Sequence, residues 1–203
     1  MRKIFVTGIG TDVGKTVVSA VLVQALKADY WKPIQTGTEL DNDTERVKKL
    51  VSNETSVFHK EAYSLKAPYA PYASAVLEGI EIDFEKITLP EINNTLIIEG
   101  AGGLLAPVTE THFIIDLIQK FNAETILVIQ NYIGSINHTL LSVEALKSRH
   151  INVIGFVVSG VENKMSEKVI LQRSGLPLLG RIYKEGTITP TIINKYEALF
   201  ATI

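Results

Sequence analysis

The fold of this chain is decided by the stretch Val6-Thr7-Gly8-Ile9-Gly10-Thr11-Asp12-Val13-Gly14-Lys15-Thr16-Val17. A short apolar segment, residues 3–6, precedes the glycines, and a largely apolar segment from Thr16 to about Ala28 follows them. These segments predict a strand before the glycine-rich loop and a helix after it. Such a loop, ending in Gly-Lys-Thr, is typical of a phosphate-binding site, because its N–H groups and the positive end of the helix dipole face the anion.

Two side chains of this loop have specific expected roles. Lys15 is placed to reach the β- and γ-phosphates of a nucleotide, and the Thr16 hydroxyl is placed to bind Mg²⁺. The spacing departs from the usual motif, because five residues rather than four separate Gly8 from Gly14. The loop is therefore a longer variant, and the alternative is a glycine-rich turn that binds nothing.

Composition and charge exclude several other classes. The chain has 203 residues, of which 46% are apolar, so one α/β domain over residues 1–203 is expected. The net charge of −2 gives no general affinity for nucleic acid. The absence of cysteine excludes a disulfide scaffold, a thiolate metal site and a cysteine nucleophile. We expect a cytoplasmic protein, because no apolar run predicts a membrane span and the loop strand follows Met1 too closely for a signal peptide.

Apolar segments alternate with helical ones along the rest of the chain. Strands are predicted at residues 30–32, 95–99, 125–129, 153–158 and 178–182. Helices are predicted at residues 113–121, 135–149, 166–174 and 191–200, with weaker helical character at 83–92. This alternation predicts a doubly wound, mostly parallel α/β sheet flanked by helices, as in P-loop nucleoside triphosphatases.

Lys32 and Asp43 each admit two interpretations. Lys32 ends a predicted strand that Pro33 stops, and ligands of α/β sheets bind beyond such carboxyl ends. Its side chain either points into that crevice or is an ordinary solvated lysine. Asp43 precedes a short amphipathic helix, so it is either the N-cap of that helix or a second Mg²⁺ ligand.

Glu99 follows a continuous apolar run and is followed by Gly100-Ala101-Gly102-Gly103. A carboxylate at the end of a buried strand is how P-loop proteins place a second acidic group near the metal. An unpaired carboxylate there is costly, so a purely structural role requires a partner. We therefore expect Glu99 near the phosphate-binding loop.

Two other segments are candidates for ligand contact. Residues 67–73 contain two prolines, which exclude a regular helix and predict a loop that either walls a ligand or packs locally. Residues 134–138 begin a helix that Ser135 is expected to cap, and a free helix N-terminus is an anion site. His138 is interpreted as a helix-face residue rather than a catalyst.

The ordered set of motifs closely resembles the dethiobiotin synthetases, ATP-dependent enzymes of biotin synthesis, over essentially the whole chain. The set comprises Thr7-Gly8-x5-Gly14-Lys15-Thr16, Trp31-Lys32-Pro33-x-x-Thr36-Gly37, Asp43, Glu99-Gly100-Ala101-Gly102-Gly103, Gly134-x-Ile136-Asn137-His138 and Pro177-Leu178-Leu179-Gly180. The combination of Lys-Pro-x-x-Thr-Gly with Glu-Gly-Ala-Gly-Gly is far more specific than the phosphate-binding loop alone.

The resemblance implies a reaction and its partners. In such enzymes 7,8-diaminononanoate captures CO₂, supplied as CO₂ or bicarbonate, as a carbamate. The carbamate attacks the γ-phosphate of ATP, and the second amine closes a cyclic urea. The resemblance also implies Mg²⁺ and a homodimer whose sites are completed across the interface.

The resemblance further implies roles for individual residues. The catalytic ones are Lys15, Lys32 and Thr11, and Mg²⁺ is held by Thr16, Asp43 and Glu99. Thr36 binds the carbamate, and the substrate carboxylate meets Gly134, Ser135, Ile136 and Asn137 of the other subunit. The nucleotide is bound by Asp12, Val13, Gly14, Lys15, Thr16, Val17, Asp43, Glu99, Gly100, Ala101, Gly102, Ser159, Gly160 and Tyr183.

Three positions depart from the family pattern. Ser159-Gly160 stands where relatives usually carry an adenine-reading Asn, Tyr183 replaces a usual Pro, and Tyr132 replaces a Lys found in some relatives. The first two weaken the expected recognition of adenine, and the third weakens the contact to the substrate carboxylate. We therefore expect other nucleoside triphosphates to be accepted.

Two rival classes remain. A partition-type ATPase, a dimerising switch, also has a long phosphate-binding loop, but it requires an early second lysine that Ile9 and Gly10 do not supply. The synthetase-like domain of a cobyrinate amidase is normally fused to a glutaminase with a cysteine nucleophile, which this chain lacks.

Overall fold

The computed structural model describes residues 1–38, 42–201 and 203, and its centre is a seven-stranded sheet in the order β4-β2-β6-β1-β7-β8-β9. All the strand pairs in this sheet are parallel, as the alternation of segments predicts. The strands are β1 (Lys3–Gly8), β2 (Asp29–Trp31), β4 (Phe58–His59), β6 (Leu96–Gly103), β7 (Glu124–Gln130), β8 (Val153–Ser159) and β9 (Leu178–Ile182).

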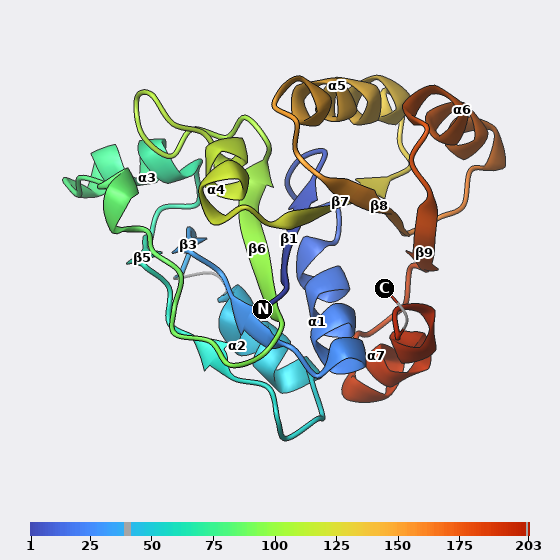
Figure 1. Cartoon of the computed structure of the whole chain (residues 1–203), viewed down its shortest axis with the longest axis horizontal. Coiled ribbons are helices and arrows are strands. Elements are labelled where there is room, and N and C mark those ends of the chain that lie inside the picture. The colour runs from blue at the N-terminus through green and yellow to red at the C-terminus, as the bar shows by residue number, and fades with distance from the viewer. Residues whose placement is uncertain (39–41, 202) are drawn as a thin grey trace.

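Helices cover both faces of this sheet (Figure 1). One face packs against α4 (Ile114–Phe121), α5 (Ser135–Ser148) and α6 (Lys164–Ser174), and the other against α1 (Lys15–Leu26), α2 (Asp43–Leu50) and α7 (Pro190–Tyr196). Each face has its own buried apolar cluster, so the sheet is a middle layer between two cores. This is the doubly wound α/β fold that the sequence predicts.

The strand–loop–helix unit at the start of the chain forms as expected. Gly14 is the N-cap of α1 with a φ of 94°, a left-handed conformation that suits glycine. A Cβ on Gly14 would also lie 2.3 Å from Ser159 Oγ, so no side chain fits there. Most of α1 is buried, in agreement with its nearly continuous apolar sequence.

Local details differ from the sequence prediction at the helix starts. Asn42, not Asp43, is the N-cap of α2, and its side chain accepts a hydrogen bond from the Glu45 N–H. Similarly, Gly134 rather than Ser135 caps α5, and Ser135 is its first residue. Both predictions were wrong by one position, because a residue of N-cap type is also acceptable in the first turn.

The segments between the main elements also bring corrections. Residues 67–73 are not entirely irregular, because α3 (Pro71–Glu78) begins at Pro71, a first-turn position that tolerates proline. The weak helix expected at 83–92 is only the 3₁₀ turn η1 (Phe84–Lys86). The edge strand β4 and a small parallel pair, β3 (Ile34–Gln35) with β5 (Tyr63–Ser64), were not predicted. A 3₁₀ turn, η2 (Glu197–Leu199), continues α7.

Among the described residues, no helix is both long and apolar enough to cross a membrane.

Candidate functional site

A cavity of about 790 Å³ opens at the carboxyl ends of the central strands, around the phosphate-binding loop. The structure places most of the predicted site residues in its lining: Thr11, Asp12, Gly14, Lys15, Thr16, Val17, Lys32, Thr36, Asp43, Glu99, Ala101 and Gly102. Parallel pairing explains this meeting, because β6 lies between β1 and β2 and Val6 of β1 is in register with Glu99 of β6.

Thr16, Asp43 and Glu99 lie in direct contact in this cavity. The Thr16 hydroxyl is 2.7 Å from Asp43 Oδ1 and 2.9 Å from Glu99 Oε1. Glu99 is 1% exposed, so its position is fixed by these partners rather than by water. Three segments that are distant in the sequence therefore present one hydroxyl and two carboxylates to a common point.

Lys32 is buried in this cluster, so its interpretation as a solvated lysine was wrong. Its ammonium lies 2.5 Å from Asp43 Oδ2 and 3.2 Å from Glu99 Oε1. The residue is 5% exposed, and its charge balances part of the charge of the two carboxylates. The expectation that Lys32 points into the crevice is confirmed.

Lys15 is the other buried cation of the cavity. It is 7% exposed, and its Nζ donates a hydrogen bond of 2.8 Å to the carbonyl of Gly10, within the loop. Burial, only partly offset by the Glu99 carboxylate and reinforced by Lys32, lowers the pKa of Lys15 to about 8. A bound anion would favour the charged form of Lys15, so the loop is expected to bind most strongly a ligand with concentrated negative charge.

The pKa values of Lys32 and Asp43 shift in the directions that favour the charged forms, because the two side chains are paired. Burial alone would lower the pKa of Lys32, but the Glu99 and Asp43 carboxylates outweigh it and raise that pKa. Burial alone would raise the pKa of Asp43, but the Lys32 ammonium and the hydrogen bond from Thr16 outweigh it and lower that pKa. Lys32 and Asp43 are thus held in their charged forms.

The donor set fits a magnesium ion. Mg²⁺ prefers oxygen ligands and is usually held by one or two carboxylates together with substrate phosphates and water. Thr16, Asp43 and Glu99 supply a hydroxyl and two carboxylates beside the phosphate-binding loop. Within the described ranges no group of three or more His, Cys, Asp or Glu side chains gathers to hold a metal.

The cavity also contains residues that sequence reasoning missed. Gln35 is buried in β3, and its Oε1 accepts a hydrogen bond of 3.1 Å from the Asp43 N–H, which fixes the start of α2. Arg46 lines the cavity, although its sequence context indicates only a helix. Residues 68–71 form part of the cavity wall, and the proline segment also bonds locally to Ser74. For Gln35 and Arg46, no local sequence signal was available.

Five predicted nucleotide-binding residues do not line the cavity, and Val13 and Gly100 are the two among them that pack tightly against neighbouring residues. Val13 is buried, and its Cγ2 would lie 2.5 Å from a Cβ on Gly8, so it packs the loop from inside. Gly100 is required for packing, because a Cβ there would lie 2.8 Å from Cε1 of Phe5.

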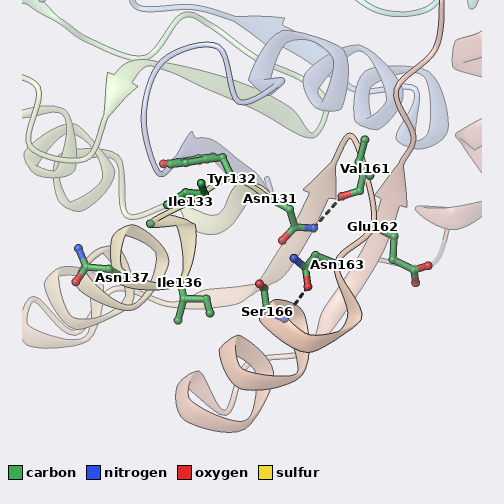
Figure 2. A pocket seen from close by; sticks show the side chains of 10 residues that line it. Asn131, Tyr132, Ile133, Ile136, Asn137, Val161, Glu162, Asn163 and Ser166 are labelled. Atoms are coloured by element: carbon green, nitrogen blue, oxygen red, sulfur yellow. Dashed lines mark hydrogen bonds between the residues drawn. The ribbon is translucent and has the colours of Figure 1, made fainter.

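The turn at the start of α5 lines a separate pocket of about 690 Å³ (Figure 2). Gly134, Ile136 and Asn137 line one side, and the loop that leads into α6 lines the other. Ser135 is buried beneath the turn. The structure therefore does not bring this predicted substrate-binding turn together with the phosphate cavity within one chain.

A polar network that begins in the lining of the α5 pocket connects this lining to α6 and β9. Asn131 Nδ2 donates to Glu167 Oε1 at 2.6 Å and to the Val161 carbonyl at 2.9 Å, a bond visible in Figure 2. Arg181 also donates to the Glu167 carboxylate. Tyr132 Oη lies 2.8 Å from Nδ1 of His138, which is an exposed residue of α5, as predicted.

The predicted base-side residues lie at the ends of β8 and β9, outside the lining of the phosphate cavity. Ser159 Oγ faces Gly14, and Gly160 is buried at the end of β8. Tyr183 is 53% exposed, and its ring lies 5.6 Å from the Arg181 guanidinium. An exposed aromatic ring and short polar groups therefore stand near the loop, without an amide side chain at the position of Ser159.

The fold and the phosphate-binding loop define a P-loop nucleotide-binding protein. Residues 2–191 match the family model described as an AAA domain. The chain is also similar to a ParA family ATPase from Chlorobium tepidum, with 10% identity, a TM-score of 0.57, and coverage of 97% of this chain and 98% of that one. This likeness concerns the fold alone.

The sequence relatives are more specific. The chain is 48% identical to the ATP-dependent dethiobiotin synthetase BioD of Christiangramia forsetii over 98% of this chain and 96% of that protein. It is also 48% identical to the protein of the same name from Cytophaga hutchinsonii, over 97% and 95% of the two chains. This chain belongs to the dethiobiotin synthetase family, whose members are ATP-dependent ligases.

Proposed function

We propose that this protein converts 7,8-diaminononanoate and CO₂ into dethiobiotin, with cleavage of a nucleoside triphosphate to the diphosphate and phosphate. The observation that carries the proposal is the buried Lys32 beside Lys15 in the phosphate cavity. Binding a triphosphate requires only the loop and its lysine. A second buried cation suits a reaction in which another anion must approach the γ-phosphate.

The proposed reaction has three steps. One amine of the substrate attacks CO₂ and loses a proton, which gives a carbamate. A carbamate oxygen attacks the γ-phosphorus, the bond to the β-phosphate oxygen breaks, and a carbamic–phosphoric anhydride and a nucleoside diphosphate form. The second amine then attacks the carbamate carbon and loses a proton, and the bond to the phosphate oxygen breaks, so that hydrogen phosphate leaves as the urea ring closes.

The residues around the cavity have corresponding roles. Lys15 neutralises the β- and γ-phosphates, and Lys32 contacts both the carbamate and the γ-phosphate as their charges converge. The hydroxyls of Thr11 and Thr36 donate hydrogen bonds to the carbamate. These groups act by position and charge, which is the main form of catalysis in phosphoryl transfer.

Thr16, Asp43 and Glu99 would hold Mg²⁺ in this proposal. The ion would neutralise phosphate charge and orient the triphosphate. Because Lys32 pairs with both of these carboxylates, its ammonium would lie beside the ion and within the same cavity as the reacting anions.

The substrate carboxylate is assigned to the turn Gly134-Ser135-Ile136-Asn137. A helix N-terminus offers free N–H groups and a positive dipole end to an anion. Because this turn lies in a separate pocket from the phosphate cavity, we infer that a second copy of the chain supplies it, in a homodimer.

The nucleotide is assigned to the loop, the glycines after Glu99 and the ends of β8 and β9. In this proposal Asp12, Gly14 and Val17 surround the phosphates, with Ala101 and Gly102 opposite, while Val13 and Gly100 pack behind this lining. Ser159, Gly160 and Tyr183 lie on the side of the base. The partition-type ATPase gains no support, because no lysine precedes Gly14 in the loop and the likeness to a ParA family ATPase is confined to the fold.

The test is triphosphate turnover with and without 7,8-diaminononanoate and bicarbonate, with mass spectrometry of the product. Turnover is expected to require both compounds, and the cyclic urea should appear in equal amount to phosphate. Turnover that neither needs nor responds to the diamine would contradict the proposal and favour a switch protein.

A further inference from the structure

The two oxygens of the Glu99 carboxylate have different partners. Oε1 faces the cavity, where it lies 2.9 Å from the Thr16 hydroxyl and 3.2 Å from the Lys32 ammonium. Oε2 faces the other way and accepts a hydrogen bond of 3.0 Å from the hydroxyl of Tyr30. Tyr30 does not line the cavity, so it has no direct access to a ligand there.

The sheet explains why Tyr30 meets Glu99. In the pairing of β2 with β6, Tyr30 is in register with Ile97, and Glu99 follows two residues later. Side chains two residues apart in a strand point to the same face of the sheet, so Tyr30 and Glu99 are diagonal neighbours on one face. This placement depends on the backbone of both strands and not on a flexible loop.

The ring of Tyr30 is fixed by its surroundings. The residue is fully buried, and its ring packs at a tilt against Phe58 of β4 with 6.2 Å between the centroids. Side chains packed in a core have few alternative rotamers. The hydroxyl is therefore a donor at a fixed place, aimed at one oxygen of a carboxylate.

We propose that Tyr30 is a positioning residue that orients Glu99 so that Oε1 is presented to the divalent cation. The inference rests on the proposed role of Thr16, Asp43 and Glu99 in holding that cation. Oε2 is buried, and without the Tyr30 hydroxyl it would lack a hydrogen-bond donor, which would favour rotation of the carboxyl group away from its present orientation. Outer partners of metal ligands change metal affinity by about 10–100-fold when they are removed.

The decisive variant is Tyr30→Phe, which removes the hydroxyl and keeps the packed ring. The measurement is binding of Mn²⁺ to the protein–ADP complex, followed by electron paramagnetic resonance. Tyr30→Phe is expected to weaken Mn²⁺ binding by about 10-fold, while ADP binding in EDTA stays within about threefold of the wild type. A loss of Mn²⁺ affinity below about threefold would overturn the inference.

A matched control separates this role from the general loss of a hydroxyl. Tyr63→Phe also removes a hydroxyl that is bonded within the fold, where it accepts from the Asp83 N–H at 2.9 Å, but Tyr63 does not touch Glu99. Its Mn²⁺ affinity is expected to equal that of the wild type. An equal loss in both variants would overturn the inference, because it would indicate a general structural effect.

A double-mutant cycle with Glu99→Gln tests whether Tyr30 acts through the carboxylate. Once Glu99→Gln has removed the charge, adding Tyr30→Phe is expected to change Mn²⁺ affinity little. Additive losses would overturn the proposal. If Tyr30→Phe does not fold, replacement of Tyr30 by 4-fluorophenylalanine, which fills the volume but cannot donate, takes its place in the same measurements.

These outcomes are independent of the reaction. If the wild type makes no dethiobiotin but Tyr30→Phe weakens Mn²⁺ binding, the proposed function is contradicted and Tyr30 is supported as a positioning residue. If the wild type makes dethiobiotin but Tyr30→Phe leaves Mn²⁺ affinity unchanged, the proposed function is supported and the role of Tyr30 is contradicted.

Discussion

The phosphate cavity and the turn at the start of α5 are built in contrasting ways. In the cavity the functional side chains are buried against one another, with Lys15, Lys32 and Glu99 only 7%, 5% and 1% exposed. At the turn, Ile133 is fully exposed and Tyr132 is 41% exposed. The first region is assembled by buried contacts within the chain, and the second presents its groups to the exterior.

This contrast has a physical reason. Charges that act on a triphosphate are most effective in a dry, pre-organised site, and here that site is built where several strands and helices pack together. A helix N-terminus already has its donors oriented, so it functions without a surrounding cluster. Substitutions in the cavity should therefore have larger effects than substitutions at the turn.

The largest effects are expected at the two lysines. Lys15→Ala and Lys32→Ala should each lower kcat by on the order of 10²-fold or more, because each removes a cation from the place where anions converge. Steady-state kinetics and nucleotide titrations measure both. Lys32→Ala should leave nucleotide binding largely intact, and Lys48→Ala, on the exposed side of α2, is the control. Equal losses of nucleotide affinity in Lys15→Ala and Lys32→Ala would show that the role of Lys32 is wrongly assigned.

The carboxylates come next. Asp43→Asn and Glu99→Gln should each raise the Mg²⁺ concentration needed for half-maximal turnover by about 10–100-fold, because anionic oxygens are the ligands that Mg²⁺ prefers. A Mg²⁺ titration at saturating nucleotide gives the result. The control is Glu45→Gln, an exposed residue in the first turn of α2. Unchanged titrations for both variants would reduce Asp43 and Glu99 to structural groups.

At the turn the expected effect is on one substrate only. Asn137→Asp places a negative charge beside the proposed carboxylate site, and it should raise the KM for 7,8-diaminononanoate by about 10-fold, or about 1.4 kcal/mol, with the KM for the nucleotide unchanged. Ser142→Asp introduces the same charge farther along α5 and is expected to behave as the wild type. If both variants raise this KM equally, the rise is caused by the added negative charge in general, and the proposed carboxylate site at the turn is contradicted.

A smaller effect is expected for the nucleobase. Each hydrogen bond to a base edge contributes about 0.5–1.5 kcal/mol, and Ser159 and Gly160 offer short groups or none. The loop, Lys15 and the metal act on phosphates and do not distinguish bases. GTP, CTP and ITP should therefore give kcat/KM values within about 10-fold of ATP. A preference of a hundredfold or more for ATP would mean that another residue reads adenine, and the region of Tyr183 would be the first place to search.

The smallest effect concerns stability near the α5 pocket. Burial alone would raise the pKa of Glu167, but hydrogen bonds from Arg181, the Asn163 N–H and Asn131 outweigh it and lower that pKa. The charged form therefore stabilises the fold above the unfolded pKa of about 4.3, and this stabilisation is lost as the pH falls through the lower folded pKa.

Thermal unfolding at several pH values measures this contribution. Glu167→Gln should lower the Tm by about 2–4 °C at pH 7, and the difference from the wild type should shrink below about pH 4. Glu144→Gln, at an exposed position of α5, should show no such pattern. A Tm difference for Glu167→Gln that is constant with pH would show that the charge of Glu167 does not contribute.

The same contrast explains what could be predicted from the sequence. The phosphate-binding loop, Lys15 and Thr16 are local signals, and the apolar runs of the parallel strands indicate the sheet directly. The burial of Lys32 depends on Asp43 and Glu99, which are 11 and 67 residues away, so propensity alone could not reveal it. The resemblance to a family placed these three residues together before the structure did.

Other features could not be read from local rules. Pro71 indicates a break when it is considered alone, but it starts α3, because the missing N–H is not needed in a first turn. The sequence around Tyr30 indicates only that this residue belongs to a strand. Its hydrogen bond to Glu99 depends on the register between β2 and β6. Register between distant strands was not available from a single sequence.

The most direct test of the account follows an oxygen atom. If a carbamate oxygen attacks the γ-phosphorus between Lys15 and Lys32, one oxygen of CO₂ ends in the released phosphate. We would supply ¹⁸O-labelled CO₂ with 7,8-diaminononanoate, stop the reaction before the label exchanges with water, and analyse the phosphate by mass spectrometry. The account predicts one ¹⁸O in each phosphate formed, and phosphate that carries only oxygen from the triphosphate and from unlabelled water would contradict it.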